Sequence, residues 1–303
     1  MDTSRIELMS PKVSYIMPVY NGSAFLREAL DSILNQSYQN IEIIVINDGS
    51  TDNSLEILNT YIDNRIIIIN QTNVGVAKSL NIGIKYSSGE FIARLDQDDL
   101  CLVHRTAIQV EYFVSNPSCS VLSGSVLYIN KNGKEMARSF PITSNYGIRK
   151  YLTHFGCIIS HPAVMMRKVD LIKVGCYSEL IGSRFTDYHL WIKFLRYGFK
   201  ISNVPTPLIK YRIWNNSMTS NFILTDKAFL KLKEILHSDY PLQSEVDKLH
   251  DLCINTNLTH SKRISQLDRT SNLIFDKLAI IGELNAMYFI CALKNLYSFF
   301  KLK

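Results

Sequence analysis

The residues best suited to chemistry form a short acidic run behind an apolar segment. Residues 91–95 read Phe-Ile-Ala-Arg-Leu, and Asp96, Gln97, Asp98 and Asp99 follow directly. A strand that ends in carboxylates places a hard anionic cluster at the carboxyl edge of a sheet. Oxygen ligands of this kind suit Mg²⁺ or Mn²⁺, and such ions usually share their coordination with substrate phosphates. The run therefore indicates chemistry on a nucleotide diphosphate.

Alternating apolar and amphipathic segments would position this acidic run. Strand-like apolar runs cover residues 13–19, 41–46, 66–69 and 91–95. Helical patterns cover residues 24–34, 54–61 and 76–86. Apolar strands separated by amphipathic helices predict βαβ units and a parallel sheet with both faces covered. Such sheets bind their ligands beyond the carboxyl ends of the strands.

Polar residues cluster where these four strands are expected to end. Each cluster alone is ordinary turn chemistry, since Asn-Gly and Asp-Gly dipeptides favour turns. Four clusters on one rim of a sheet are better explained as a binding site. They are Pro18, Tyr20, Asn21 and Gly22; Asn47, Asp48, Gly49, Ser50 and Asp52; Asn73 and Gly75; and Asp96 and Asp98.

The regular alternation is lost after Asp99, which indicates a second half of different construction. Strands at 121–129 and 135–140 flank Asn132-Gly133, a favourable hairpin turn. The other elements expected are a helix at 148–154, a strand at 163–167, a helix at 187–197, a strand at 208–213 and helices from Phe222 onward.

Length and composition indicate an ordinary globular protein. The 303 residues are 47% hydrophobic and 20% charged, which fits one large domain with an appendage or two domains. The formal charge of +6 is explained slightly better by a solvated surface than by an anionic membrane or substrate, and we expect no nucleic-acid partner. The six cysteines form no Cys-x-x-Cys pair, and residues 1–12 lack the apolar segment of a signal peptide. A cytoplasmic location is therefore expected.

Four motifs, in order along the chain, resemble those of family 2 glycosyltransferases. They are Val13–Gly22, Val45–Asp52, Asn73–Gly83 and the Asp-x-Asp motif at Asp96–Asp99. The resemblance covers roughly residues 12–215 and implies an α/β architecture, the GT-A fold, with a Rossmann-like, mostly parallel sheet flanked by helices. The organisation expected from it is a catalytic domain at 1–220, divided into a nucleotide-binding half at 12–100 and an acceptor half at 101–220, and a C-terminal helical region at 221–303.

The resemblance also implies inverting transfer of a sugar from a nucleotide diphosphate donor, here a UDP-sugar. It places Asp48 on the uracil, Lys78 near the base or the diphosphate, Asp96 on the ribose and Asp98 on the Mn²⁺ or Mg²⁺ ion. That ion would stabilise the charge that builds on the leaving oxygen. The full set of residues assigned to the nucleotide is Pro18, Tyr20, Asn21, Asp48, Lys78, Asp96 and Gln97.

The reaction also needs a general base, because an acceptor hydroxyl is a weak nucleophile. The base must lie opposite the diphosphate, and Asp187, at the start of a predicted helix, is the best candidate. Taken alone it would be an N-cap; relatives carry an acidic pair before a helix here, and Thr186 replaces the first acid. Glu179 is better explained as solvated surface, and Asp99 as a helix cap or a group that supports the metal site.

The chain departs from the family pattern at one position. Many relatives carry Tyr-Arg-x-His, whose histidine can help to ligate the metal, whereas residues 211–214 here read Tyr-Arg-Ile-Trp. Trp214 cannot ligate a metal; it could stack on a sugar or the acceptor, although core packing is the default for tryptophan. His161 is an alternative metal ligand, with an acceptor-site or loop-packing role somewhat favoured. Arg94 and Arg167 could neutralise phosphate, but salt bridges explain them at least as well.

The last segment, residues 287–303, combines apolar and aromatic side chains with lysines and contains no acid. An interfacial helix and a helix packed on protein explain this pattern about equally well. Relatives that build bacterial surface polysaccharides use lipid-linked acceptors at the cytoplasmic face, which implies peripheral contact with the inner face of the plasma membrane.

Two hypotheses from different classes follow. The leading one is a metal-dependent hexosyltransferase that extends a glycan or a lipid-linked saccharide in capsule or O-antigen synthesis. The alternative is a non-catalytic nucleotide-sugar-binding partner subunit. A dinucleotide-dependent oxidoreductase is disfavoured because no Gly-x-Gly-x-x-Gly follows the first strand.

Overall fold

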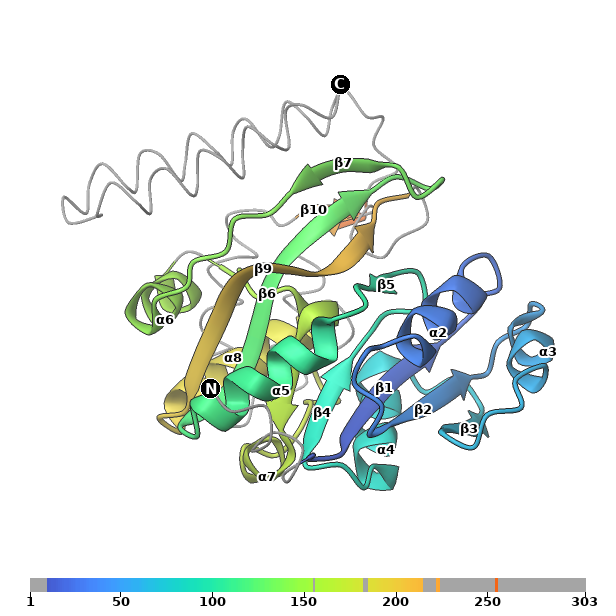
Figure 1. Ribbon diagram of the computed structural model, residues 1–303, viewed down its shortest axis with the longest axis horizontal. Coiled ribbons are helices and arrows are strands. Elements are labelled where there is room, and N and C mark those ends of the chain that lie inside the picture. The colour runs from blue at the N-terminus through green and yellow to red at the C-terminus, as the bar shows by residue number, and fades with distance from the viewer. Residues whose placement is uncertain (1–9, 155, 182–184, 215–221, 224–253, 256–303) are drawn as a thin grey trace.

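One mixed sheet runs through the protein, and helices cover both of its faces (Figure 1). The computed structural model describes residues 10–154, 156–181, 185–214, 222–223 and 254–255. Within these ranges the strands of the main sheet lie in the order β3-β2-β1-β4-β8-β6-β9-β5, with β7 paired to β6.

The N-terminal half of the sheet is parallel. Its strands are β1 (Val13–Val19), β2 (Ile41–Asp48), β3 (Ile66–Gln71) and β4 (Phe91–Arg94). β1 pairs in parallel with both β2 and β4, and β2 with β3. Every residue of β2 is buried, as its continuous apolar run predicts. The predicted βαβ alternation is confirmed, and the loops after these strands leave the sheet at one edge.

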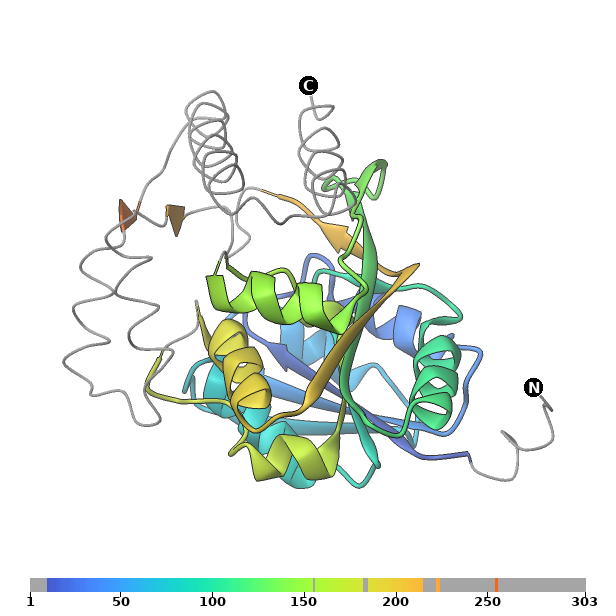
Figure 2. The same cartoon turned by 90° about the vertical axis from the view of Figure 1, so that its left-hand side faces the viewer.

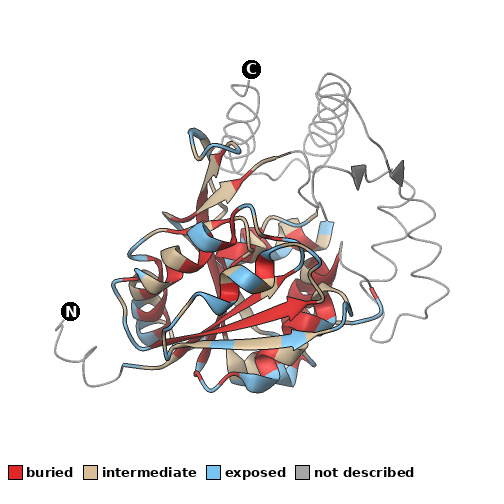
Figure 3. Ribbon diagram, turned by 90° about the vertical axis from the view of Figure 1, so that its right-hand side faces the viewer, coloured by how far each residue is buried: buried red, intermediate tan, exposed pale blue. Residues whose placement is uncertain are grey.

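Connecting helices separate the hydrophobic interior into two cores. The connections are α2 (Leu26–Leu34), α3 (Ser54–Asn59) and α4 (Val76–Tyr86). Alternate residues of β2 enter different cores, because side chains alternate along a strand. Ile43 belongs to the core that includes α2, and Ile44 to the core that includes α4. Figure 3 shows the buried strands enclosed by helices that expose their outer sides.

The second half extends the sheet beyond β4. β8 (Met165–Arg167) pairs antiparallel with β4 and with β6 (Cys119–Ile129). β6 pairs in parallel with β9 (Lys200–Arg212), and β5 (Leu100–Cys101) completes the sheet on β9. The strand predicted at 208–213 is thus the end of a longer strand.

The predicted hairpin is confirmed. β7 (Glu135–Arg138) pairs antiparallel with β6, and Gly133 in the turn has a φ of +79°, which favours glycine. The helices of this half are α5 (Arg105–Ser115), α6 (Asn145–His154), α7 (Lys168–Lys173) and α8 (Thr186–Arg196), and a 3₁₀ turn, His161–Ala163, precedes β8.

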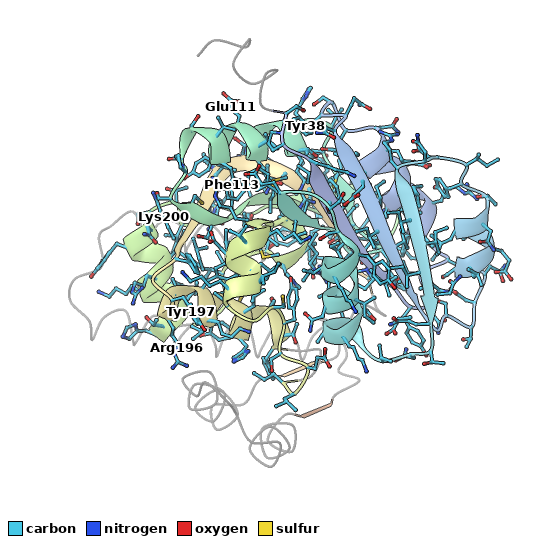
Figure 4. All side chains as sticks on the ribbon, turned by 90° about the horizontal axis from the view of Figure 1, so that it is seen from below. Tyr38, Glu111, Phe113, Arg196, Tyr197 and Lys200 are labelled. Atoms are coloured by element: carbon cyan, nitrogen blue, oxygen red, sulfur yellow. The ribbon has the colours of Figure 1, made fainter. Side chains whose placement is uncertain are left out.

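Helices of the second half lie on opposite faces of the sheet. α6 and α8 contact each other and β9 (Figure 2). On the other face α5 turns the fully buried Phe113 toward the sheet and the exposed Glu111 outward (Figure 4). The site described below lies at the carboxyl edge of the parallel strands, beside the start of α8.

The helical pattern expected from Phe222 onward is wrong for its first residues. β10 (Phe222–Ile223) pairs antiparallel with β11 (Ile254–Asn255). The other residues of the expected C-terminal helices, including 287–303, lie outside the described residues. Among the residues that are described, no helix combines the length and the apolar character that crossing a bilayer requires.

Candidate active site

Hydrogen bonds join the loops after β1 and β2 into one rim. The backbone N–H of Asn21 donates to Ser50 Oγ at 3.1 Å, and that of Thr51 donates to Asn21 Oδ1 at 2.8 Å. Asn21 has a φ of +51°, a left-handed conformation that asparagine tolerates. Pro18 lies within β1, opposite Ile46 of β2. The contacts predicted for Pro18 and Asn21 with a nucleotide stay predictions.

Gln97 joins the loop after β4 to the same rim. Its Oε1 accepts the backbone N–H of Tyr20 at 2.9 Å, and its Nε2 donates to the Tyr20 carbonyl at 3.0 Å. A Cβ on Gly22 would lie 2.6 Å from Gln97 Cδ, so a side chain here would displace the Gln97 amide. The Tyr20 ring is 49% exposed at the rim. Gln97, predicted to bind the nucleotide, thus already uses its amide to hold the backbone beside it.

Asp48 organises the loop that leads into α4. Its Oδ1 accepts hydrogen bonds from Gln71 Nε2 at 2.7 Å and the Val74 N–H at 2.9 Å, and its Oδ2 accepts the Gly75 N–H at 3.0 Å. The carboxylate, predicted to contact uracil, therefore has three donors from its own chain. Lys78 is exposed in the first turn of α4. Contacts of Asp48 and Lys78 with a nucleotide also stay predictions.

Three carboxylates follow β4 in the sequence, at Asp96, Asp98 and Asp99. Asp96 Oδ1 forms an ion pair with Arg94 Nη2 at 2.6 Å. Burial and the Asp96 charge raise the pKa of Asp98. Burial and the charges of Asp96 and Asp98 raise the pKa of Asp99 well above its usual range. Burial and neighbouring negative charge thus both disfavour the ionised forms of Asp98 and Asp99.

Hydrogen bonds from the end of β9 and the residues just after it hold this acidic run in place. Asp99 Oδ1 accepts the backbone N–H of Arg212 at 2.8 Å, and Arg212 Nε donates to the Asp98 carbonyl at 2.9 Å. Trp214 Nε1 donates to Asp98 Oδ2 at 2.8 Å, while its ring meets Phe25 edge-on at 5.1 Å. The interpretation of Asp99 as a helix cap is wrong, because the next helix begins only at residue 105. Contact of Trp214 with an acceptor stays a prediction.

Asp187 lies in the first turn of α8. Phe185 is the N-cap of this helix, so the N-cap interpretation of Asp187 is wrong. Asp187 Oδ1 accepts the N–H of Tyr188 at 2.8 Å, and Oδ2 lies 3.9 Å from the thiol of Cys157. Burial raises the pKa of Asp187, although the Tyr188 N–H and the Arg94 charge oppose that rise. A carboxylate with a raised pKa is a better proton acceptor.

His161 lies in the 3₁₀ turn before β8. Its Nε2 is 2.8 Å from the hydroxyl of Tyr177, and its ring meets Trp191 edge-on at 5.8 Å. Burial and the Arg94 charge lower the pKa of His161 well below its usual range, so the imidazole is neutral. Its predicted role as a metal ligand stays a prediction.

Arg94 is the group that these side chains share. Arg94 is 5% exposed, and its charge lowers the pKa of Asp98, of Asp187 and of His161. Because Coulomb interactions weaken with distance, Asp98 and Asp187 both lie near this one cation. That Asp98 and Asp187 act together in one active site stays a prediction. Arg94 Nε and Nη1 are buried and have no hydrogen-bond partner among the described residues.

Comparisons with known proteins decide the family. Residues 14–175 match the family described as glycosyl transferase family 2. The glycosyltransferase EpsE of Bacillus subtilis is 35% identical over 76% of this chain and 86% of its own length. This chain belongs to glycosyltransferase family 2. The amylovoran biosynthesis glycosyltransferase AmsE of Erwinia amylovora is 27% identical to it, over 69% of this chain and 79% of AmsE.

Solved structures show which fold this glycosyltransferase has. TarS of S. aureus in complex with UDP-GlcNAc has a TM-score of 0.56 at 21% identity, over 78% of this chain and 70% of that one. The same TarS fragment in complex with UDP has a TM-score of 0.54 at 22% identity. The predicted GT-A fold is confirmed.

The acidic run of this glycosyltransferase fits a divalent cation whose remaining ligands come from outside the protein. Asp99 Oδ2 is buried without a hydrogen-bond partner, and the pKa of Asp98 and that of Asp99 are raised by burial and by neighbouring carboxylates. Across the described part of the chain, however, no three His, Cys, Asp or Glu side chains gather to hold a metal. An ion here would take its other ligands from substrate phosphate and water.

Several residues around the site were not identified from the sequence. Tyr177 and Cys157 belong to no motif, and only the fold brings them beside His161 and Asp187. Arg167, considered as a phosphate ligand, donates instead to the carbonyls of Cys119 and Phe113 at 3.0 and 2.9 Å. Its role is structural.

Proposed function

We propose that this glycosyltransferase moves a sugar from a UDP-sugar to a hydroxyl group of a glycan or lipid-linked saccharide, with inversion, during polysaccharide synthesis. The observation that supports the proposal is that the charge of Arg94 acts on both Asp98 and Asp187. The complexes of TarS with UDP and UDP-GlcNAc support the donor, and the amylovoran enzyme AmsE supports the product class. The alternative of a non-catalytic subunit has no support from EpsE or AmsE, which are both named as glycosyltransferases.

The proposed reaction is a single displacement. The acceptor oxygen forms a bond to the anomeric carbon while Asp187 takes its proton, and the bond from that carbon to the diphosphate oxygen breaks. UDP leaves with the bonding electrons. Because the acceptor enters from the face opposite the leaving group, the anomeric configuration inverts.

The chain's own residues prepare this displacement from two sides. Asp98 would hold the Mn²⁺ or Mg²⁺ ion together with the diphosphate, and such an ion supplies Lewis-acid stabilisation of the leaving oxygen. The Tyr188 N–H holds the Asp187 carboxylate in one orientation at the start of α8. A lipid-linked acceptor would require the enzyme to work at the inner face of the cytoplasmic membrane, through peripheral contact.

Product stereochemistry tests the proposal. A panel of UDP-sugars with Mn²⁺ and saccharide or lipid-linked acceptors is expected to give one product, whose anomeric centre by NMR is opposite to that of the donor. Asp187→Asn is expected to lower kcat by at least about 10²-fold, the contribution typical of a general base. A product that retains the donor configuration, or an Asp187→Asn enzyme of full activity, would overturn the assignment of Asp187.

A further inference from the structure

Trp214 makes a contact that neither its packing nor an acceptor-binding role explains. Its indole N–H donates to Asp98 Oδ2 at 2.8 Å, across 116 positions of sequence. The indole N–H is a donor only and cannot bind a metal ion. The backbone N–H of Asp98 also forms a hydrogen bond to the Asp98 carboxylate. Oδ2 is therefore held by a donor that would compete with a metal ion for this oxygen.

The indole is held firmly enough to orient the carboxylate. Trp214 follows Arg212, which is 2% exposed and donates to the Asp98 carbonyl, the Lys131 carbonyl at 2.8 Å and Glu28 Oε2 at 2.8 Å. The Arg212 guanidinium also lies over the Phe25 ring, 4.2 Å from its centre.

The same Phe25 ring packs edge-on against Trp214. The Phe25 side chain therefore supports both Arg212 and Trp214, the two residues that donate hydrogen bonds to the acidic run. Three contacts thus fix the acidic run to β9, through the Asp99 carboxylate, the Asp98 carbonyl and the Asp98 carboxylate.

We propose that Trp214 is a positioning residue that fixes Asp98 with a single oxygen directed to the cation of the nucleotide donor. The inference rests on the proposed function, since it presumes a donor-bound divalent ion. Groups that hydrogen-bond a metal-binding carboxylate orient it and raise the affinity of the site. Trp214 would do this from the position where many relatives supply a ligand directly.

The test compares Trp214→Phe with Trp214→His. Phenylalanine keeps an aromatic ring against Phe25 but has no N–H, whereas a neutral imidazole can donate one. Mn²⁺ is titrated by calorimetry into each protein at saturating UDP, and UDP is also titrated without metal. Trp214→Phe is expected to bind Mn²⁺ about 10–100-fold more weakly, the usual effect of losing such a partner. Trp214→His is expected to retain the wild-type affinity or exceed it.

Other outcomes overturn the proposal in distinguishable ways. UDP affinity without metal should stay unchanged in Trp214→Phe, because the lost contact acts on the cation side of Asp98. Unchanged Mn²⁺ affinity in Trp214→Phe, or equal losses in both variants, would refute the positioning role alone. A wild-type enzyme that binds UDP without any dependence on Mn²⁺ would refute the metal part of the proposed function as well.

Discussion

The charge of Arg94 acts on both carboxylates of the proposed reaction, Asp98 and Asp187. Arg94 pairs with Asp96 at 2.6 Å, and its charge opposes the rise that burial causes in the pKa of Asp187. The sequence placed Arg94 next to the Asp-x-Asp motif, and a salt bridge explained it at least as well as a phosphate contact. The structure shows the salt bridge and adds the influence on Asp187, which comes from α8 and is invisible in local sequence.

Removing that charge should change the pH dependence of catalysis. Without the Arg94 cation the Asp187 carboxylate is less stable, so its pKa rises and the base becomes protonated at higher pH. The acid limb of kcat/KM against pH is therefore expected to move upward in Arg94→Met, while Arg94→Lys, which keeps the charge, should move it less. A pH profile that falls in height without any shift of this limb would show that Arg94 does not act on the base.

At the scale of elements, the rim depends on how closely α4 packs on β1 and β2. Gly83 of α4 lies where a Cβ would overlap Ile16 and approach Ile46 Cδ1 to 2.8 Å. α4 can pack this close to β1 and β2 only because position 83 carries no side chain. The turn at Asp48 and Gly75, which begins α4, is placed by the same packing.

Gly83→Ala should therefore destabilise the protein. Alanine normally stabilises a helix relative to glycine by about 0.5–1 kcal/mol, whereas overpacking a core costs about 1–3 kcal/mol. The net expectation is a loss in the free energy of unfolding, measured by urea denaturation. Lys85→Ala, at an exposed position of the same helix, is the matched control and should change stability by less than about 0.5 kcal/mol. A stabilised Gly83→Ala protein would contradict the packing described here.

Glu42 lies near the amino end of β2, at the end of the parallel strands opposite to the site. Its ionisation should change how the free energy of unfolding depends on pH. Burial would raise the pKa of Glu42, but hydrogen bonds from Lys12, Ser14 and Ser88 outweigh it and hold the pKa at about 2. Because the unfolded value is about 4.3, Glu42 contributes stability above that pH and loses it as the pH falls toward 2. The free energy of unfolding of Glu42→Gln should therefore decline less steeply across this range, and equal slopes would contradict the assignment.

At the scale of the whole molecule, the sequence predicts the first half of the fold better than the second. The parallel strands are nearly continuous apolar runs, so their pattern is local and readable. β9 was expected only from residue 208 because Pro205 and Pro207 interrupt its pattern, yet the strand begins at Lys200. The contact between Trp214 and Asp98 depends on where that strand ends, which no local pattern encodes.

The two halves of the molecule each supply one part of the proposed reaction. The parallel half presents Asp98 at the end of β4, and the second half presents Asp187 at the start of α8. The proposal therefore predicts that substitutions of Asp98 and of Asp187 have different effects. Asp98 would act on donor binding, and Asp187 would act on the chemical step.

The most direct test measures Mn²⁺-dependent UDP binding and sugar transfer side by side in Asp98→Ala and Asp187→Ala. Both variants should lose transfer, but only Asp98→Ala should lose the Mn²⁺-dependent part of UDP affinity, because Asp187 is proposed to act on the acceptor. Calorimetry gives the affinity, and a transfer assay gives the turnover. Full transfer by Asp187→Ala, or an equal loss of UDP affinity in both variants, would contradict the account.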